Sequence, residues 1–160
     1  MSKDTKIIVI TSAVRTPIGT FRGSLNEMKA SDLGALVVKA AIKKSNLNPH
    51  DVDEVIMGQV LTGAAGQNPA RQTLIQAGLP VDKTAYTINQ VCGSGLRSVA
   101  AGYQSVISND AKIIIAGGQE SMTNAPHAIY YRESKKLDET PCNNNKYCEW
   151  DSDECIFKNN

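Results

Sequence analysis

The stretch from Thr84 to Ile107 constrains the fold most strongly, because it joins a short strand to a helix through a single cysteine. Residues 84–88 are rich in β-formers, and apolar residues recur at helical spacing beyond Cys92. A cysteine placed where a strand meets a helix N-terminus lies near unpaired N–H groups and about half a positive charge. This setting favours the thiolate, which is the nucleophilic form.

Glycines follow Cys92 directly, and we expect them to let the backbone turn sharply and let another group come close. A buried structural cysteine is the alternative, since cysteine is among the most buried residue types. Redox and acyl-transfer nucleophiles share this position, so the pattern alone leaves these interpretations open. It is not the hydrolase elbow G-x-S-x-G, because Gln90 stands at its first glycine, nor a phosphate loop, because no lysine follows.

The remaining apolar segments alternate between strand and helix patterns along the chain. Such alternation predicts an α/β fold with a mainly parallel sheet. The predicted strands are residues 6–13, 53–61, 84–88 and 112–117, and the predicted helices are residues 31–46, 69–79 and the segment that follows the cysteine.

Two of these helices carry terminal signals. Asn68 is the expected cap of helix 69–79, and Pro69 is its expected first residue. Ser31 is the expected cap of the first helix. The predicted buried stripe of that first helix consists of Leu33, Leu36, Val37, Ala40 and Ala41.

The composition is that of an ordinary soluble globular chain, with 41% hydrophobic and 21% charged residues. A length of 160 residues favours one domain. The net charge of +1 gives no reason to expect nucleic acid or an anionic membrane as a partner. The longest apolar runs, 7–10 and 113–116, are too short for a signal-peptide core or a membrane span, so we expect a cytoplasmic protein.

The other cysteines and the histidines provide few further candidates. Cys142, Cys148 and Cys155 form no C-x-x-C pair and fit no metal template, so no metal site is predicted. His50 follows a proline in a loop and is expected to be solvated. His127 follows the last predicted strand and is not expected to contact substrate.

The segment I-N-Q-V-C-G-S-G-L, residues 88–96, closely resembles the acyl-enzyme motif of the thiolases, in particular of the acetyl-CoA acetyltransferase branch. Three other segments resemble signatures of the same family in the same order: A-V-R-T-P-I-G at 13–19, G-Q-N-P-A-R-Q at 66–72 and G-G-Q-E-S-M at 117–122. The resemblance extends from about residue 6 to about residue 132 and covers only the front part of a family chain.

The resemblance implies an incomplete thiolase N-terminal domain, residues 1–132, followed by a divergent tail, residues 133–160. This tail is polar and aperiodic, and we expect it to be loop or disordered. The implied fold is thiolase-like, with this chain supplying the N-terminal βαβαβαβ half of an αβαβα sandwich. Family membership also implies a homo-oligomer.

The implied chemistry centres on Cys92, which would attack an acyl-CoA and carry the acyl group as a thioester while its own backbone N–H supports the oxyanion. The implied reaction is the Claisen condensation of two acetyl-CoA molecules to acetoacetyl-CoA, with coenzyme A thioesters as substrates and no cofactor. The family's later histidine, asparagine and second-cysteine motifs do not occur in the sequence, so we expect no turnover by this chain alone. The alternative is a non-catalytic remnant or interaction fragment; a redox sensor is disfavoured because no second cysteine precedes Cys142.

Overall fold

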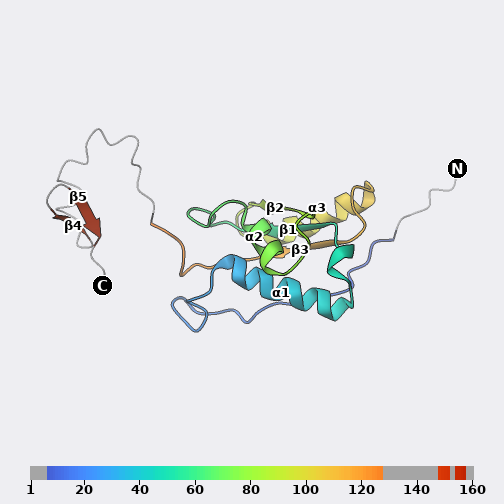
Figure 1. Cartoon of the computed structure of the whole chain (residues 1–160), viewed down its shortest axis with the longest axis horizontal. Helices are drawn as coiled ribbons and strands as arrows, with labels where there is room; N and C mark the ends of the chain where they lie inside the picture. Colours follow the sequence, from blue (N-terminus) through green and yellow to red (C-terminus); the bar gives the residue numbers. More distant parts are fainter. Residues whose placement is uncertain (1–6, 128–147, 152–153, 158–160) are drawn as a thin grey trace. The chain divides into compact units, whose positions relative to one another are not determined.

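The computed structural model describes residues 7–127, 148–151 and 154–157 of the 160-residue chain. The chain divides into two compact units, residues 1–126 and residues 127–160, and each unit is considered separately. The described part of the first unit contains three strands and three α-helices (Figure 1). No helix in the described ranges has the length and apolar character needed to cross a membrane.

Three parallel strands form the sheet of the first unit, in the order β2-β1-β3. Glu54 of the central strand lies opposite Thr84 on one side and Ile114 on the other. Because the strands are parallel, their carboxyl ends meet at one edge of the sheet. The prediction of an α/β fold with a mainly parallel sheet is confirmed. The strands are β1, Glu54–Gly58; β2, Thr84–Ile88; and β3, Ile114–Gly118.

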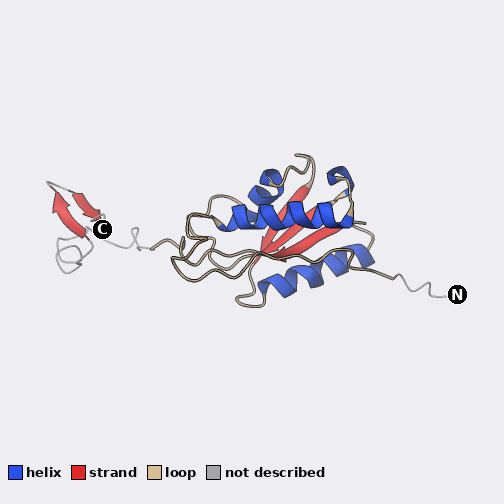
Figure 2. Cartoon of the chain, turned by 90° about the horizontal axis from the view of Figure 1, so that it is seen from below, coloured by secondary structure: helices blue, strands red, loops and turns tan. Residues whose placement is uncertain are grey.

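Helices cover both faces of this sheet (Figure 2). Helix α1, Ala30–Ser45, packs against helix α2, Pro69–Gln76, whereas α3, Ser94–Ile107, packs against all three strands. The predicted start of α2 is confirmed: Asn68 Oδ1 accepts a hydrogen bond from the Arg71 N–H, and a proline occupies the first helical position.

The alternation of side chains along the strands assigns each helix to a face. Val55 and Met57 of β1 belong to the core cluster that also contains residues of α1 and α2. On the other face, Gly102 of α3 approaches the sheet so closely that an added Cβ would lie 3.2 Å from Ile114 Cγ2 and 3.5 Å from Ala116 Cβ. The first unit is therefore a three-layer α/β/α arrangement.

The predicted first strand, residues 6–13, is wrong for its described part. Residues 7–13 form no strand, and Ile7, Val9 and Ile10 are 85%, 69% and 78% exposed. A strand needs a neighbour for its N–H and C=O groups, and no described segment pairs with these residues. Apolar content alone therefore misidentified the segment.

The predicted cap and buried stripe of α1 are also wrong. Lys29 is the N-cap residue, and its backbone N–H donates to Asp32 Oδ2 at 3.1 Å. Leu36 is 50% exposed, whereas Val38 and Ile42 are buried. A close contact with α2 selects this face, because a Cβ on Gly34 would lie 2.9 Å from Thr73 Oγ1.

The second unit contains a two-stranded antiparallel sheet, where the sequence predicted loop or disorder. Strand β4, Cys148–Asp151, pairs with β5, Glu154–Phe157, and Cys148 lies opposite Phe157. Each strand has only four residues, which is the shortest run over which alternation of apolar and polar residues indicates a strand. Cys142 lies outside the described residues.

Candidate active site

The carboxyl edge of the sheet holds Cys92, in the connection between β2 and α3. Cys92 follows Ile88, the last residue of β2, by four positions and precedes Ser94, the first residue of α3, by two. Its thiol is free and the residue is exposed. No described residue accepts a hydrogen bond from its backbone N–H. A thiol and an unengaged N–H are therefore presented together beside a helix N-terminus.

The sharp turn before Cys92 is made by Val91, which has a left-handed φ of 49°. The prediction that the glycines would supply this turn is wrong, because Gly93 has an ordinary φ of −84°. A left-handed conformation is rare for a β-branched residue and costs on the order of 1–3 kcal/mol. Strain of this kind persists only where the surrounding structure fixes it.

Two polar side chains fix the turn. Asn89 Oδ1 accepts a hydrogen bond from the Val91 N–H at 3.0 Å. Ser94 Oγ accepts from the Gln90 N–H at 2.8 Å and donates to the Val91 carbonyl at 2.6 Å. The polar backbone groups on both sides of the strained residue are thereby satisfied. The sequence motif contained both residues, and an asparagine two positions before a turn residue is the signal that could have predicted the first bond.

Glycines at three positions bring the first turn of α3 directly onto the sheet. A Cβ on Gly118 would lie 3.2 Å from Gly95 Cα, and a Cβ on Gly58 would meet the backbone of Ser94. The expectation that glycine permits close approach near the cysteine is met at Gly95. One turn further along α3, Ser98 Oγ lies 2.6 Å from the Gly117 carbonyl oxygen and is positioned to donate to it.

A buried chain of side-chain amides lies behind this edge. The Thr73 hydroxyl donates to Gln119 Oε1 at 2.6 Å, and Gln119 Nε2 donates to Gln59 Oε1 at 2.9 Å. Glu120 accepts hydrogen bonds from the backbone N–H groups of Val60 and the next residue, at 2.8 and 3.3 Å. These bonds tie the loop after β1 to the end of β3 and hold the edge in one arrangement.

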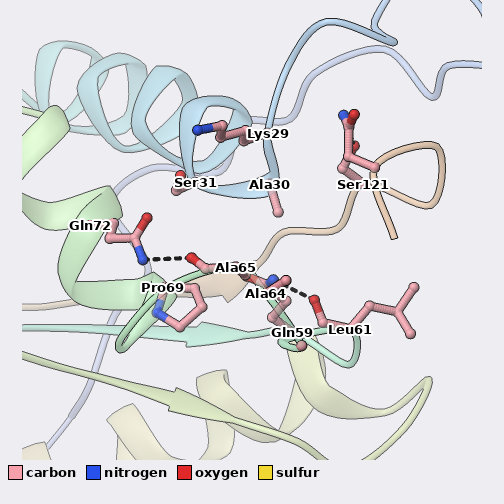
Figure 3. Close-up of a pocket in the computed structure, with 13 residues that line it drawn as sticks. Lys29, Ala30, Ser31, Gln59, Leu61, Ala64, Ala65, Pro69, Gln72 and Ser121 are labelled. Carbon is pink, nitrogen blue, oxygen red and sulfur yellow. Dashed lines mark hydrogen bonds between the residues drawn. The ribbon is translucent and has the colours of Figure 1, made fainter. Parts of the chain in front are cut away.

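A pocket of about 500 Å³ opens beside these amides at the N-terminal ends of α1 and α2 (Figure 3). Gln72 Nε2 donates to the Ala65 carbonyl at 2.7 Å, and Gln59 Nε2 donates to the Leu61 carbonyl at 2.9 Å. These bonds shape the pocket wall. Cys92 is not among its lining residues, so this pocket is distinct from the cysteine turn.

His50, the other candidate residue of the first unit, does not join Cys92. His50 lies in a short 3₁₀ helix before β1, at the amino edge of the sheet, whereas Cys92 lies at the carboxyl edge. His127 is exposed. Cys148 and Cys155 belong to strands β4 and β5 of the second unit. Within the first unit, no described histidine is therefore at the carboxyl edge.

Among the residues that the structure describes, two groups have shifted pKa values, and neither lies in the cysteine turn. The backbone N–H groups of Ile113 and Lys112 hydrogen-bond to Asp53 and lower the pKa of its carboxyl group. Burial, followed by the nearby charge of Glu54, raises the pKa of Tyr86 on β2. Asp53 therefore serves to join the amino ends of β1 and β3.

Comparisons with known proteins place this architecture in a family. The family model described as "Thiolase, N-terminal domain" matches residues 8–156, beyond the point near residue 132 where the motif resemblance stops. The chain is 54% identical over 129 residues to an acetyl-CoA acetyltransferase of Paracoccus denitrificans, covering 81% of this chain and 33% of that protein. It is 55% identical over 122 residues to one of Chromobacterium violaceum, covering 76% of this chain and 31% of that protein.

A solved structure agrees with the sequence comparisons. The Acat5 thiolase from Ascaris suum, crystallised in complex with coenzyme A, superposes with a TM-score of 0.74 and 43% identity, over 75% of this chain and 31% of that one. This chain thus spans about a third of the length of the relatives it matches. The parallel sheet, the helices on both its faces and these matches show that the chain belongs to the thiolase family.

Proposed function

We propose that Cys92 is the acyl-accepting nucleophile of an acetyl-CoA acetyltransferase active site, of which this chain carries the N-terminal part. One observation supports this most directly: an exposed thiol and an unengaged backbone N–H lie together at the start of α3. The names of the relatives, acetyl-CoA acetyltransferases, indicate the substrate class.

The first chemical step is transfer of an acyl group. The Cys92 thiolate attacks the carbonyl carbon of acetyl-CoA, and negative charge develops on the carbonyl oxygen, where the Cys92 N–H can donate a hydrogen bond. The bond between this carbon and the coenzyme A sulfur then breaks. Coenzyme A leaves as a thiolate that takes up a proton, and the acetyl group remains as a thioester on Cys92.

The second step is condensation with another acetyl-CoA, and it makes further demands. A base must remove a proton from the α-carbon of the second thioester, and a donor must stabilise the resulting enolate oxygen. His50 cannot serve because it lies at the opposite edge of the sheet. We therefore assign acyl capture, and not condensation, to the described residues of this chain.

The test is transfer of an acetyl group from acetyl-CoA. Purified chain is incubated with acetyl-CoA, and intact mass and peptide mapping locate the added acetyl group. We expect stoichiometric labelling of Cys92 that disappears in Cys92→Ser. Labelling that survives this substitution, or none in the folded wild-type chain, contradicts the proposal.

We further propose that the chain self-associates, which would also be open to a non-catalytic interaction fragment. The outward face of α3 carries large apolar side chains, with Leu96 78% exposed and Tyr103 56% exposed. Its inward face holds the small buried residues Ser94, Ser98 and Gly102. An apolar stripe facing away from the sheet favours a partner surface, and a second copy of the chain provides one.

Two further assignments complete the proposal. An exposed free thiol is kept reduced in the cytosol, and this supports a cytoplasmic location. The division into a thiolase N-terminal domain, residues 1–132, and a tail, residues 133–160, is retained as a proposal. Proteolysis with mass mapping tests this boundary, since a stable product ending near residue 132 is expected.

A further inference from the structure

The conformation of Val91 requires more support than its own side chain provides. The residue has a φ of 49°, is β-branched and is 66% exposed, so core packing does not hold its side chain. Hydrogen bonds to the backbone of the turn must therefore maintain the left-handed conformation.

Those hydrogen bonds come from residues on both sides of the cysteine. Asn89 Oδ1 accepts a hydrogen bond from the Val91 N–H. The Ser94 hydroxyl accepts a hydrogen bond from the Gln90 N–H and donates one to the Val91 carbonyl. The Ser94 backbone N–H also donates to the Val91 carbonyl, at 3.1 Å. Cys92 lies between these two polar residues and makes none of these bonds through its side chain.

Both polar residues are themselves anchored to the sheet. Asn89 Nδ2 donates to the Val60 carbonyl at 3.2 Å, and the Val60 N–H donates to Glu120 at 2.8 Å. Ser94 is only 4% exposed, and its backbone packs on Gly58. The turn is therefore fixed to the ends of β1 and β3 and cannot shift independently of them.

We propose that Asn89 and Ser94 are positioning residues for Cys92, an inference that rests on the proposed role of Cys92 as the acyl-accepting nucleophile. Because Cys92 directly follows Val91, the left-handed turn sets the direction of both the thiol and the backbone N–H. Attack on a carbonyl needs both groups aligned on one acyl group. Loss of either side chain, Asn89 or Ser94, lets Val91 leave the left-handed conformation. The Cys92 thiol and the Cys92 N–H then no longer point toward the same acyl group.

Loss of this positioning should slow acyl transfer to Cys92 more than it slows alkylation of Cys92. Iodoacetamide alkylation needs only an accessible thiolate, whereas acyl transfer also needs the N–H aimed at the developing oxyanion. Ser94→Ala and Asn89→Ala are expected to lower the ratio of the acylation rate to the alkylation rate by about tenfold or more. A residue that only stabilised the fold would leave this ratio unchanged.

The experiment measures both rates at Cys92 of the full chain, by peptide mapping, because the sequence also contains Cys142, Cys148 and Cys155. Phenyl thioacetate is the acyl donor, because it presents a thioester without the rest of coenzyme A, and iodoacetamide is the alkylating reagent. Ser98→Ala is the matched control: it removes a buried serine hydroxyl from the same helix, one turn from the cysteine turn. Ser94→Thr retains the hydroxyl and should keep the ratio within about threefold of wild type. Asn89→Asp retains the acceptor for the Val91 N–H but loses the donor to the Val60 carbonyl, so we expect it to restore the ratio only in part.

The outcomes separate the two proposals. A lowered ratio in Ser94→Ala and Asn89→Ala, but not in Ser98→Ala, supports positioning. An unchanged ratio in both variants, or an equal loss in the control, overturns it. If Ser94→Ala does not fold, Asn89→Ala decides, since that side chain is exposed. If wild-type Cys92 accepts an acetyl group from phenyl thioacetate but not from acetyl-CoA, the positioning role stands and the proposed function is overturned. If it accepts an acetyl group from neither donor, both proposals are overturned.

Discussion

A Cβ atom on Gly58 would lie 2.5 Å from the backbone nitrogen of Gly95, so strand β1 and the first turn of α3 meet backbone to backbone. Gly58→Ala should therefore force the helix away from the sheet and lower the free energy of unfolding by about 2–3 kcal/mol. Gly117→Ala is the control, because nothing lies within 4 Å of the Cβ it would add. Chemical denaturation of both variants tests this, and equal losses would contradict it.

Replacement of the strained valine should stabilise the chain. Val91→Gly removes the cost of a left-handed β-branched residue, and we expect a gain of about 1 kcal/mol after the entropy cost of glycine. Val81→Gly provides the comparison, since Val81 is also highly exposed and is absent from the positive-φ residues. That control should lose about 0.5–1 kcal/mol in denaturant unfolding. Similar losses in both variants would show that the strain is not stored at Val91.

Asp53 should make stability depend on acid pH. Its pKa is lowered in the folded chain by hydrogen bonds from the Ile113 and Lys112 N–H groups, so its contribution is fully present above the unfolded pKa, near 3.9. This contribution is lost as the pH falls through the lower, folded pKa. Asp53→Asn should cost about 1 kcal/mol at pH 7, and the difference from wild type should shrink toward pH 3. Urea unfolding at both pH values measures this, and a constant difference would refute it.

Self-association should depend on the outward face of α3. Leu96→Glu places a charge in the apolar stripe and should weaken association by about tenfold or more. Leu36→Glu is the matched control, because Leu36 is also an exposed leucine on a helix but belongs to α1. Sedimentation analysis distinguishes them, and a monomeric wild-type chain would end the proposal.

Sustained turnover should be absent. A positioned base contributes about 10²–10⁴-fold and an oxyanion donor about 10²–10³-fold, so the condensation step should be slowed by on the order of 10⁴-fold or more without them. Coenzyme A-dependent cleavage of acetoacetyl-CoA is measured in protein freed of host thiolase. Steady activity above that of Cys92→Ala would mean that other residues of this chain assemble a complete site.

The sequence predicted the order of strands and helices well from β1 onward, because local signals agreed with the fold there. Asn68 and Pro69 start α2 as expected, and residues 84–88 form β2 as predicted. These elements are specified by nearby residues. The predictions were wrong where contacts with distant residues determine the structure. Residues 7–13 have no described strand beside them, and the close contact at Gly34 determines which face of α1 is buried.

The cysteine turn shows the same limit at the candidate site. The position of Cys92 between strand and helix could be inferred from β-formers, glycines and helical spacing. The left-handed conformation of Val91 could not be inferred, because glycine adopts such a conformation most easily and two glycines follow Cys92. The hydrogen bonds of Asn89 and Ser94, which a sequence pattern does not display, made the valine acceptable there.

The parallel sheet has its first strand in the middle, and this arrangement sets an order of events during synthesis. β1 emerges from the ribosome before either neighbour; β2 then adds to one side, and β3 closes the other. We expect the cysteine turn to gain its final conformation only after Gly118 and Glu120 have been made, because Gly118 packs on Gly95 at the start of α3 and Glu120 holds Val60, whose carbonyl accepts the hydrogen bond from Asn89 Nδ2. Nascent chains stalled before β3 should therefore remain sensitive to protease at the turn, and longer ones should become resistant.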